Sequence, residues 1–301
     1  MNVMFAKRVV MGFCLSFSVI FNFISESGSV FAEEPLVVKI RPFREKNIDY
    51  TKEYKYQLLE LVLNKTVSKD GSFRIEVAGE ETIAQSRVIE LIDRGDLTLI
   101  TVMTSKEREE KLLPVRIPVY KGLWGHRIFI INRKDLNKFA AIQTEKELKA
   151  LWAGQGHDWP DTQILKANGY NVVTSPNYSG LFAMLNKGRF DYFPRAVNEP
   201  WREVEVEKAR DVVVEPTLLI QYHAPAYFFV SKQNKALAER LKRGFEAVIR
   251  DGSFDRLFNS HWYIQDTLKL ANIQKRRIFR LKNPLLTAQT PLDRPELWFQ
   301  P

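Results

Sequence analysis

A short apolar stretch, Leu36-Val37-Val38-Lys39-Ile40, opens the part of the chain that decides the fold class. It has the composition of a buried strand, and a helical pattern over residues 54–63 follows it. An alternating strand at 73–77, a second helical pattern at 84–92 and a strand at 97–102 come next. This β-α-β-α-β order predicts a parallel sheet covered by helices, with ligands bound beyond the carboxyl ends of its strands.

A second alternating series begins after a crossing segment at residues 117–125. We expect further helices around 148–152, 164–165 and 181–186, and strands at the following positions: 127–131, 139–142, 171–174 and 190–193. Two extended segments and two amphipathic helices complete the pattern, at 211–214, 226–230, 237–249 and 254–262. The expected fold class is therefore α/β, with a second lobe built like the first.

Composition describes a folded globular chain: 301 residues, of which 45% are hydrophobic and 27% charged. Four histidines and one cysteine leave little material for a metal centre, so we expect neither a metal nor a cofactor. The net charge of +9 raises the question of a polyanionic partner, but the basic residues are interspersed with acids. We therefore expect no nucleic acid partner, and a solvated segment rather than a polyanion site at Lys275-Arg276-Arg277.

The N-terminal residues have the pattern of a secretory signal peptide. Lys7 and Arg8 precede an apolar stretch at 9–24, and Val30-Phe31-Ala32 offers a cleavage site after Ala32. The alternative is an uncleaved anchor, for which the apolar stretch falls short of the ~20 residues that a membrane span needs. The single cysteine, Cys14, lies within this stretch, so the mature chain is free of thiols. We expect a periplasmic protein.

Three groups of motifs resemble one known family. They are Leu91–Leu97 with Met103–Arg108 and Pro118–Leu123, then Leu185–Asp191, and finally Leu241–Phe245 with Asp251–Phe254 and His261-Trp262. In this order they are similar to the periplasmic solute-binding proteins of the polar amino acid ABC transporters, which are family 3 proteins with the type II periplasmic binding fold.

The resemblance implies a two-lobed protein with two crossing strands as its hinge. The first lobe would comprise residues 33–119 and 221–301, with a C-terminal extension at 264–301, and the second lobe residues 120–220. Such a protein closes over a small carboxylate-bearing or anionic, amino-acid-like solute. It would deliver that solute, as a monomer, to the membrane permease of an ABC transporter.

The resemblance also implies ligand-binding residues in the first lobe. In the family, a hydroxyl residue three positions before an arginine grips the ligand's carboxylate, and these positions are Ser105 and Arg108 here. The alternative is that Arg108 makes a surface ion pair within the charged run 106–111. Arg41 would direct a second positive charge at the cleft, and Phe43 would either stack on the ligand or pack beneath it.

In the second lobe, the family's ammonium-binding aspartate falls on Ala196, which is a departure from the pattern. Arg195 beside it adds a third cation, and Glu199 is the nearest acid that could replace the missing one. Gln155 lies in the segment whose backbone N–H groups bind ligand in the family. Trp159 and Tyr178 are either pocket walls or core.

Three arginines against one acid favour an anionic ligand, because unpaired buried cations are costly. If Glu199 bound an ammonium group, an ordinary neutral amino acid would again be favoured.

Other readings remain open. A soluble sensor for a membrane receptor or kinase would have the same sequence features. An enzyme is disfavoured, because the four histidines are scattered and no nucleophile and base are paired. The prolines and the apolar residues Leu297-Trp298-Phe299 of the tail predict an arm that packs on the first lobe, or else a peptide that docks a partner.

Overall fold

The computed structural model describes Met1 and residues 34–41, 49–78 and 85–300. The signal peptide expected at 1–32 lies outside the described residues except for Met1, and so do Cys14 and Phe43. Residues 34–301 form one compact unit.

The first sheet has five strands in the order β2-β1-β3-β11-β4. Their bounds are Leu36–Ile40 for β1, Phe73–Val77 for β2, Leu99–Met103 for β3, Leu113–Val115 for β4 and Ala226–Val230 for β11. Strand β1 runs parallel to β2 and β3, whereas β11 is antiparallel to β3 and β4. With α1 (Tyr54–Asn64) after β1 and α3 (Gln85–Asp93) after β2, the predicted β-α-β-α-β order is confirmed.

The second sheet has the order β12-β10-β5-β8-β6-β7, and β9 pairs with β5 beside this path. The bounds are His126–Asn132 for β5, Trp152–Gly156 for β6, Asn171–Ser175 for β7, Tyr192–Ala196 for β8, Val212–Val214 for β9, Leu218–Gln221 for β10 and Arg277–Arg280 for β12. Strand β5 is antiparallel to its neighbours, while β6 runs parallel to β7 and β8.

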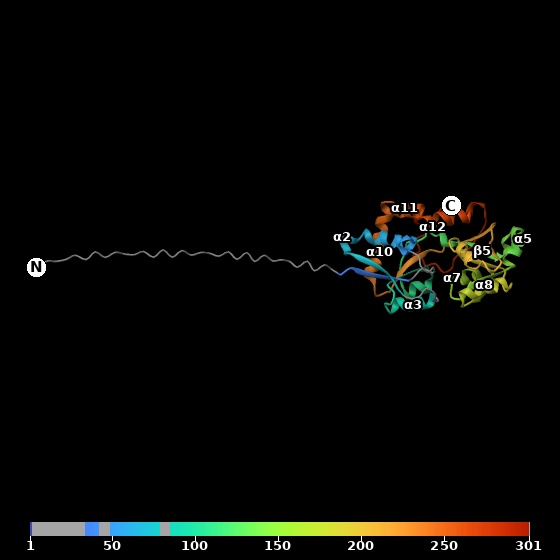
Figure 1. Ribbon diagram of the computed structural model, residues 1–301, viewed down its shortest axis with the longest axis horizontal. Helices are drawn as coiled ribbons and strands as arrows, with labels where there is room; N and C mark the ends of the chain where they lie inside the picture. The colour runs from blue at the N-terminus through green and yellow to red at the C-terminus, as the bar shows by residue number, and fades with distance from the viewer. Residues whose placement is uncertain (2–33, 42–48, 79–84, 301) are drawn as a thin grey trace. The chain divides into compact units, whose positions relative to one another are not determined.

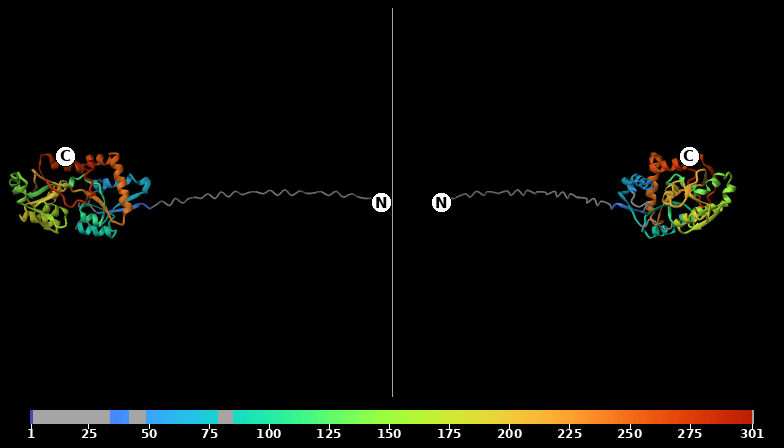
Figure 2. Two further views of the ribbon diagram at one scale, coloured as in Figure 1. Left: turned by 180° about the vertical axis from the view of Figure 1, so that it is seen from behind. Right: turned by 45° about the vertical axis from the view of Figure 1, so that its right-hand side comes forward.

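Helices flank the two sheets as separate groups. Figure 1 shows α2, α3 and α10 grouped on one side, with α5, α7 and α8 on the other beside β5, and the view from behind in Figure 2 keeps the two groups apart. The remaining helices are α2 (Val67–Asp70), α4 (Lys106–Lys111), α5 (Leu136–Ala140), α6 (Glu145–Lys149), α7 (Pro160–Ala167), α8 (Tyr178–Asn186), α9 (Pro200–Val206), α10 (Lys235–Arg250), α11 (Ser253–Ser260) and α12 (Trp262–Ala271). Short 3₁₀ turns lie at Tyr50–Lys52, Leu123–Gly125, Arg133–Asp135, Ile273–Lys275 and Pro295–Leu297.

Two predictions about local structure were wrong. Residues 139–142 were expected to form a strand, but Phe139 lies in helix α5, where it is fully buried. A short apolar run is compatible with either a strand or a helix, and this one begins in a helix. The helix expected around 148–152 ends at Lys149, and Trp152 already belongs to strand β6. Its glycines hide the strand, because glycine has low strand propensity.

Packing explains those glycines. A Cβ atom on Gly154 would lie 2.2 Å from the Phe190 ring, and one on Gly156 would lie 2.4 Å from the Trp159 ring. Aromatic rings therefore occupy the space that side chains would need on both sides of Gln155.

Two crossing segments join the sheets side by side. One leads from β4 to β5 and the other from β10 to β11, and the Tyr222 N–H donates to the Gly125 carbonyl oxygen at 3.0 Å. A Cβ atom on Gly125 would lie 1.8 Å from the Tyr222 carbonyl oxygen, so only glycine permits this approach.

The C-terminal extension contacts both sheets, and not the first lobe alone as expected. Its strand β12 pairs with β10 in the second sheet, while Leu297 is fully buried in the core cluster that contains α1 and α10. The expectation of a solvated basic run was wrong for Arg276. This side chain is buried and donates to the carbonyl oxygens of Ala271 and Leu218 at 2.6 and 3.0 Å.

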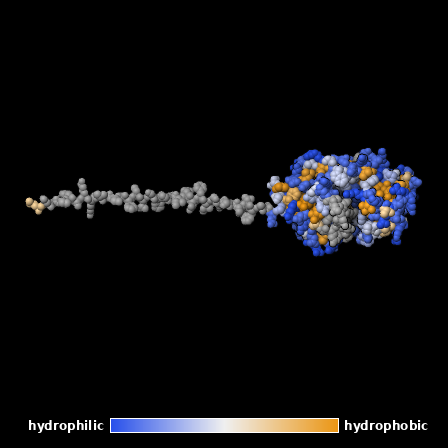
Figure 3. All heavy atoms as spheres, viewed as in Figure 1, coloured by the Kyte–Doolittle hydropathy of each residue, from blue (hydrophilic) through white to orange (hydrophobic). Residues whose placement is uncertain are grey.

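No helix within the described ranges is long and apolar enough to cross a membrane. On the face shown in Figure 3, hydrophobic residues form small separate groups among hydrophilic ones.

Candidate functional site

The carboxyl end of β3 carries two of the expected ligand-binding residues. Ser105 caps helix α4, since its hydroxyl accepts the backbone N–H of Arg108 at 3.2 Å. The Arg108 side chain turns back and donates from Nη1 to the Met103 carbonyl oxygen at 2.6 Å. Arg108 is 5% exposed, so it is not the surface residue of the alternative interpretation.

Acids of the second sheet's helices act on Arg108 electrostatically. Burial lowers the pKa of the Arg108 guanidinium to about 10, and the charges of Asp158 and Asp161 oppose that shift. The group is therefore a cation at neutral pH. Asp161 lies in the first turn of α7 and Asp158 just before that helix, so the two sides of the molecule meet here as opposite charges.

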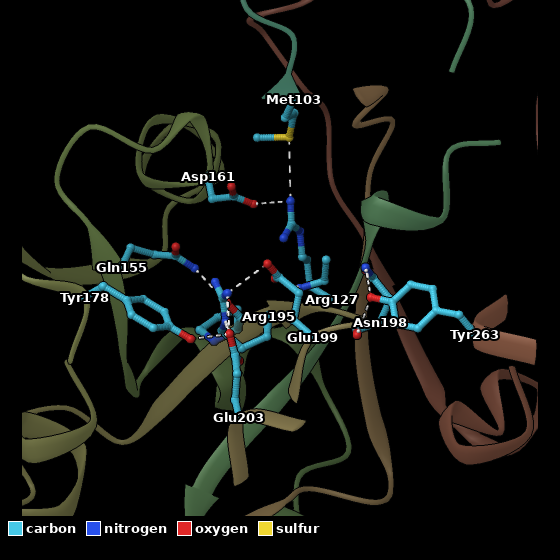
Figure 4. Close-up of polar contacts among 12 residues, drawn as sticks. Met103, Arg127, Gln155, Asp161, Tyr178, Arg195, Asn198, Glu199, Glu203 and Tyr263 are labelled. Atoms are coloured by element: carbon cyan, nitrogen blue, oxygen red, sulfur yellow. Dashed lines mark hydrogen bonds and ion pairs between the residues drawn. The ribbon is translucent and has the colours of Figure 1, made fainter. Parts of the chain in front are cut away.

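Arg127, which the sequence analysis did not single out, lies at the start of β5. Its Nη2 is 2.8 Å from Asp161 Oδ1 and 3.6 Å from the Sδ atom of Met103, as Figure 4 shows. The Asp161 carboxylate also accepts the Tyr222 hydroxyl from the crossing segment, and the Arg127 guanidinium lies 5.6 Å from the Tyr222 ring. The Arg127 and Asp161 side chains are almost wholly buried.

Arg195 is paired, which corrects the expectation of a cation without a protein partner. It donates from Nε to Glu203 Oε2 at 2.8 Å and from Nη2 to Glu203 Oε1 at 2.6 Å. Glu199 adds a second carboxylate 2.8 Å from Nη2. These two carboxylates outweigh burial and raise the pKa of Arg195 well above its ordinary value.

Aromatic rings enclose the same guanidinium. It lies 4.9 Å from the centroids of Trp159 and Phe193 and 5.6 Å from that of Tyr178, and the Trp159 and Phe193 rings are stacked. Tyr178 donates its hydroxyl to Glu203 at 2.5 Å. Trp159 and Tyr178 are half-buried and pack against the core beside Arg195, so both alternatives, pocket wall and core, stay predictions.

Glu199 serves the backbone as well as Arg195. Its Oε2 accepts the Ala196 N–H at 2.9 Å, and its side chain is 25% exposed. Ala196, which replaces the family's aspartate, is buried at the end of β8. Whether Glu199 substitutes functionally for that aspartate stays a prediction.

Gln155 places its side chain, and not only its backbone, beside Arg195. Its Nε2 donates to the Pro194 carbonyl oxygen at 3.1 Å, and the residue is 1% exposed. Figure 4 shows the Gln155 amide between Asp161 and Arg195 in that view.

Arg41 stands further back along the first sheet. It follows β1 directly and is half-buried, and Ile40 before it pairs with Leu99, the first residue of β3. Arg108, by contrast, reaches Met103, the last residue of β3. The roles predicted for Arg41 and Phe43 stay predictions.

We call the assembled group the arginine cluster and define it by seven residues: Arg108, Arg127, Gln155, Asp161, Arg195, Glu199 and Glu203. Its three guanidinium groups lie among three carboxylates, and Asp158 beside the cluster also acts on Arg108. The inference from charge alone set Arg41, Arg108 and Arg195 against one acid, and it does not hold for Arg108 and Arg195, which have acidic neighbours. A site that contains groups of both charges suits a ligand that itself carries both charges.

Arg127 and Glu203, which sequence reasoning missed, could be inferred only weakly from the sequence. Glu199 and Glu203 are one helical turn apart, so the acid considered near Ala196 pointed to a second on the same face. Arg127 is a charge inside an otherwise apolar strand, which signals a buried partner without naming it. Within the described part of the chain, no group of three histidine, cysteine or acidic side chains could hold a metal ion.

Solved structures of known proteins share this architecture. An ancestral arginine-binding protein bound to arginine aligns with a TM-score of 0.52 and 16% identity, over 75% of this chain and 98% of that chain. A periplasmic binding protein from Salmonella typhimurium, described as highly specific for arginine, aligns with a TM-score of 0.52 and 12% identity, over 75% and 99% of the two chains. A histidine kinase sensor domain with similarity to periplasmic binding proteins aligns with a TM-score of 0.51 and 14% identity, over 77% of this chain and 97% of that chain.

No protein-family model matches the sequence, and no curated protein matches it significantly. The structural likenesses establish the fold. This chain has the two-lobed α/β fold of type II periplasmic binding proteins, as the sequence motifs predicted.

Proposed function

We propose that this protein binds a small amino-acid-like solute between its two lobes and closes over it. The observation that carries the proposal is the arginine cluster, in which Arg108 of α4, just after β3, feels the charges of Asp158 and Asp161 at the start of α7. Charged side chains buried at the junction of two sheets, beside two crossing segments, suit a site that opens and closes about a hinge.

Charge balance supports a zwitterionic ligand. A carboxylate could accept hydrogen bonds from Arg108, whose guanidinium offers a fixed set of donors. Asp161, Glu199 and Glu203 supply the negative charge that an ammonium group needs nearby. A ligand with both groups leaves the net charge of the closed cluster unchanged, whereas a simple anion would add uncompensated charge to a buried region.

The location, processing and partner that we propose are those expected from the sequence. The mature protein would begin after Ala32 and act in the periplasm, as a monomer with lobes at 33–119 plus 221–301 and at 120–220. The loaded form would dock on the permease of an ABC transporter. We propose a binding protein and not an enzyme.

A thermal-shift screen of refolded mature protein against amino acids, dicarboxylates, sulfonates and short peptides tests the proposal. A ligand at ~1,000 times its dissociation constant adds about 4 kcal/mol to the unfolding free energy, which moves the melting temperature by roughly 10 °C for a chain of this size. We expect a shift of this kind with amino acids. No shift with any compound of the panel would contradict the proposal.

The matched pair of variants is Arg108→Ala and Arg94→Ala. Arg94 is exposed and its Nε lies 3.3 Å from Asp96 at the surface, so its loss should leave the ligand response intact. Arg108→Ala should remove most of that response. Full retention of the response in Arg108→Ala would overturn the role of Arg108.

A further inference from the structure

We infer that Arg127 and Gln155 together bind the two charged groups of the ligand. Arg127 donates to its carboxylate, and Gln155 accepts from its ammonium group. The inference rests on the proposed function and names the two residues that set its specificity. Neither role follows from the family resemblance, which assigned nothing to Arg127 and only backbone contacts to the segment of Gln155.

Two buried polar atoms of the arginine cluster lack a hydrogen-bond partner among the described residues. They are Nε of Arg127, which is a donor, and Oε1 of Gln155, which is an acceptor. Arg127 is 5% exposed and Gln155 1% exposed, so neither atom is turned to bulk water. Buried polar groups in folded proteins are almost always paired, and an exception is explained by strain, by a water or ion, or by a functional partner.

The orientation of the Gln155 amide is fixed by its other contact. The Pro194 carbonyl oxygen can only accept, so the nitrogen of the amide must face it and the oxygen is the atom left over. The rings against Gly154 and Gly156 pack on the face of the strand opposite Gln155. Gln155 therefore presents an acceptor to whatever enters the cluster.

Asn198 carries another unpaired amide oxygen, but it lies outside the arginine cluster. Its Oδ1 lacks a partner among the described residues, while its Nδ2 donates to the Tyr263 hydroxyl at 2.9 Å. That hydroxyl in turn donates to the Asn198 carbonyl oxygen at 3.1 Å, so the pair is local to Asn198 and Tyr263, and we assign Asn198 no role in ligand binding.

Arg127 is held so that it can share a carboxylate with Arg108. Its Nη2 contacts Asp161 and the Met103 sulfur, while Arg108 donates to the carbonyl oxygen of the same methionine. The two guanidinium groups thus meet at Met103 from two different sheets. Asp161 helps to raise the pKa of Arg127 against the effect of burial, so the group stays charged.

The two unpaired atoms have opposite hydrogen-bonding character. A carboxylate alone would satisfy Arg127 and leave Gln155 unpaired, and an amine alone would do the reverse. An α-amino acid carries both groups on one carbon and therefore offers a partner of the right kind to each atom. The site should therefore bind zwitterions in preference to other ligands, because a ligand that lacks either group leaves a buried polar atom unpaired.

Binding preferences measured by titration calorimetry test the inference. The probes are the twenty standard L-amino acids and, for the one that binds the wild-type protein most tightly, its desamino acid and its α-carboxamide. The wild-type protein should prefer the amino acid over each analogue by about 10- to 100-fold, the effect of a hydrogen bond to a charged group. The variants are Gln155→Met and Arg127→Lys, with Gln221→Met as the control amide outside the cluster.

Each variant should lose one preference and keep the other. Gln155→Met should bind the amino acid and its desamino analogue within about threefold of each other, while its preference for carboxylate over carboxamide persists. Arg127→Lys, which keeps the charge beside Asp161, should show the opposite pattern, and Gln221→Met should match the wild type.

The outcomes separate the inference from the proposed function. If wild-type protein binds none of the amino acids, both fail. If it binds one and Gln155→Met, folded as judged by its unaided melting curve, keeps the full preference for the ammonium group, the inference alone is overturned. Because that arm does not involve Arg127, it holds even if Arg127→Lys does not fold.

Discussion

Arg127 contacts Met103 across the two sheets, with Nη2 3.6 Å from Sδ. Met103 ends β3 of the first sheet and Arg127 lies in β5 of the second, so this contact joins the places where both sheets contribute charged groups. Arg108 and Arg127 converge on one residue, and their partners come from a helix and a crossing segment that belong to neither strand. Opening of the lobes would separate these groups, and a ligand would take their place.

The buried ion pair of Arg195 should dominate the local stability of the second sheet. Glu203→Gln leaves a buried guanidinium short of one carboxylate, and we expect a loss of about 3 kcal/mol in the free energy of unfolding. Urea denaturation measures it. Glu205→Gln is the control, because Glu205 is 75% exposed in its pair with Lys208 and should change stability by no more than ~0.5 kcal/mol. Equal losses in the two variants would contradict the buried pair.

Gly122 should be irreplaceable because of Trp298. It has φ +74°, and a Cβ atom there would lie 2.5 Å from Cε3 of Trp298. Gly95 has φ +78° and nothing within 4 Å, so Gly95→Ala should cost only the ~1 kcal/mol of backbone strain. Gly122→Ala should cost about 3 kcal/mol, since overpacking adds to that strain.

A double-mutant cycle isolates the contribution of the ring. In a Trp298→Ala background the cost of Gly122→Ala should fall to that of Gly95→Ala, as measured by thermal and urea unfolding. An unchanged cost in that background would show that the tail does not pack on Gly122.

His126 should make the protein less stable in mild acid. Burial lowers its pKa to about 4, from 6.5 in the unfolded chain, so between these values the unfolded state binds more protons. The stability is complete above pH 6.5, is lost as the pH falls toward 4, and amounts to about 3 kcal/mol for this residue.

Urea denaturation at pH 7, 5.5 and 4 measures this dependence. His126→Gln keeps an acceptor for the Gln221 side chain, 3.0 Å away in the native protein, and should flatten the pH slope. His157→Gln, at an exposed histidine, serves as the control and should not. The same slope in both variants would contradict the assignment to His126.

The C-terminal extension should be part of the folded core. Leu297 is fully buried, and Leu297→Ala should cost about 2–5 kcal/mol in unfolding free energy. Leu292 in the same extension is 50% exposed, and Leu292→Ala should be nearly neutral. A neutral Leu297→Ala would favour the alternative that the tail is a docking peptide.

Local sequence patterns predicted the first sheet because its elements are locally determined. Strand β1 is a short apolar stretch that contains three β-branched residues, and helix α1 repeats apolar residues at helical spacing. Ser105 and Arg108 could be placed together for the same reason, since three positions separate them at a helix start. Strand β6 was not predicted, because two of its five residues are glycines. These glycines make room for aromatic rings that pack against the strand, and those rings come from outside the strand.

The charge pairing of the site could not be predicted, since partners distant in the chain create it. Arg127 meets Asp161 only when β5 and α7 come together, and Tyr222 joins them from a crossing segment. Counting charges near one motif therefore missed the acidic partners that Arg127 and Arg195 have in the folded site. The C-terminal strand β12 was missed as well, because its pairing partner β10 is an equally short strand far away in sequence.

Closure of the lobes on a ligand is the central claim, and a distance measurement between them tests it most directly. Past the expected cleavage site the chain has no cysteine, so Glu90→Cys and Lys166→Cys would place two spin labels on exposed positions of α3 and α7. Double electron–electron resonance spectroscopy should show a population with a longer distance between the labels in the refolded, ligand-free protein. This population should disappear when the protein is saturated with an amino acid that it binds. A distance distribution that the bound amino acid leaves unchanged would contradict closure.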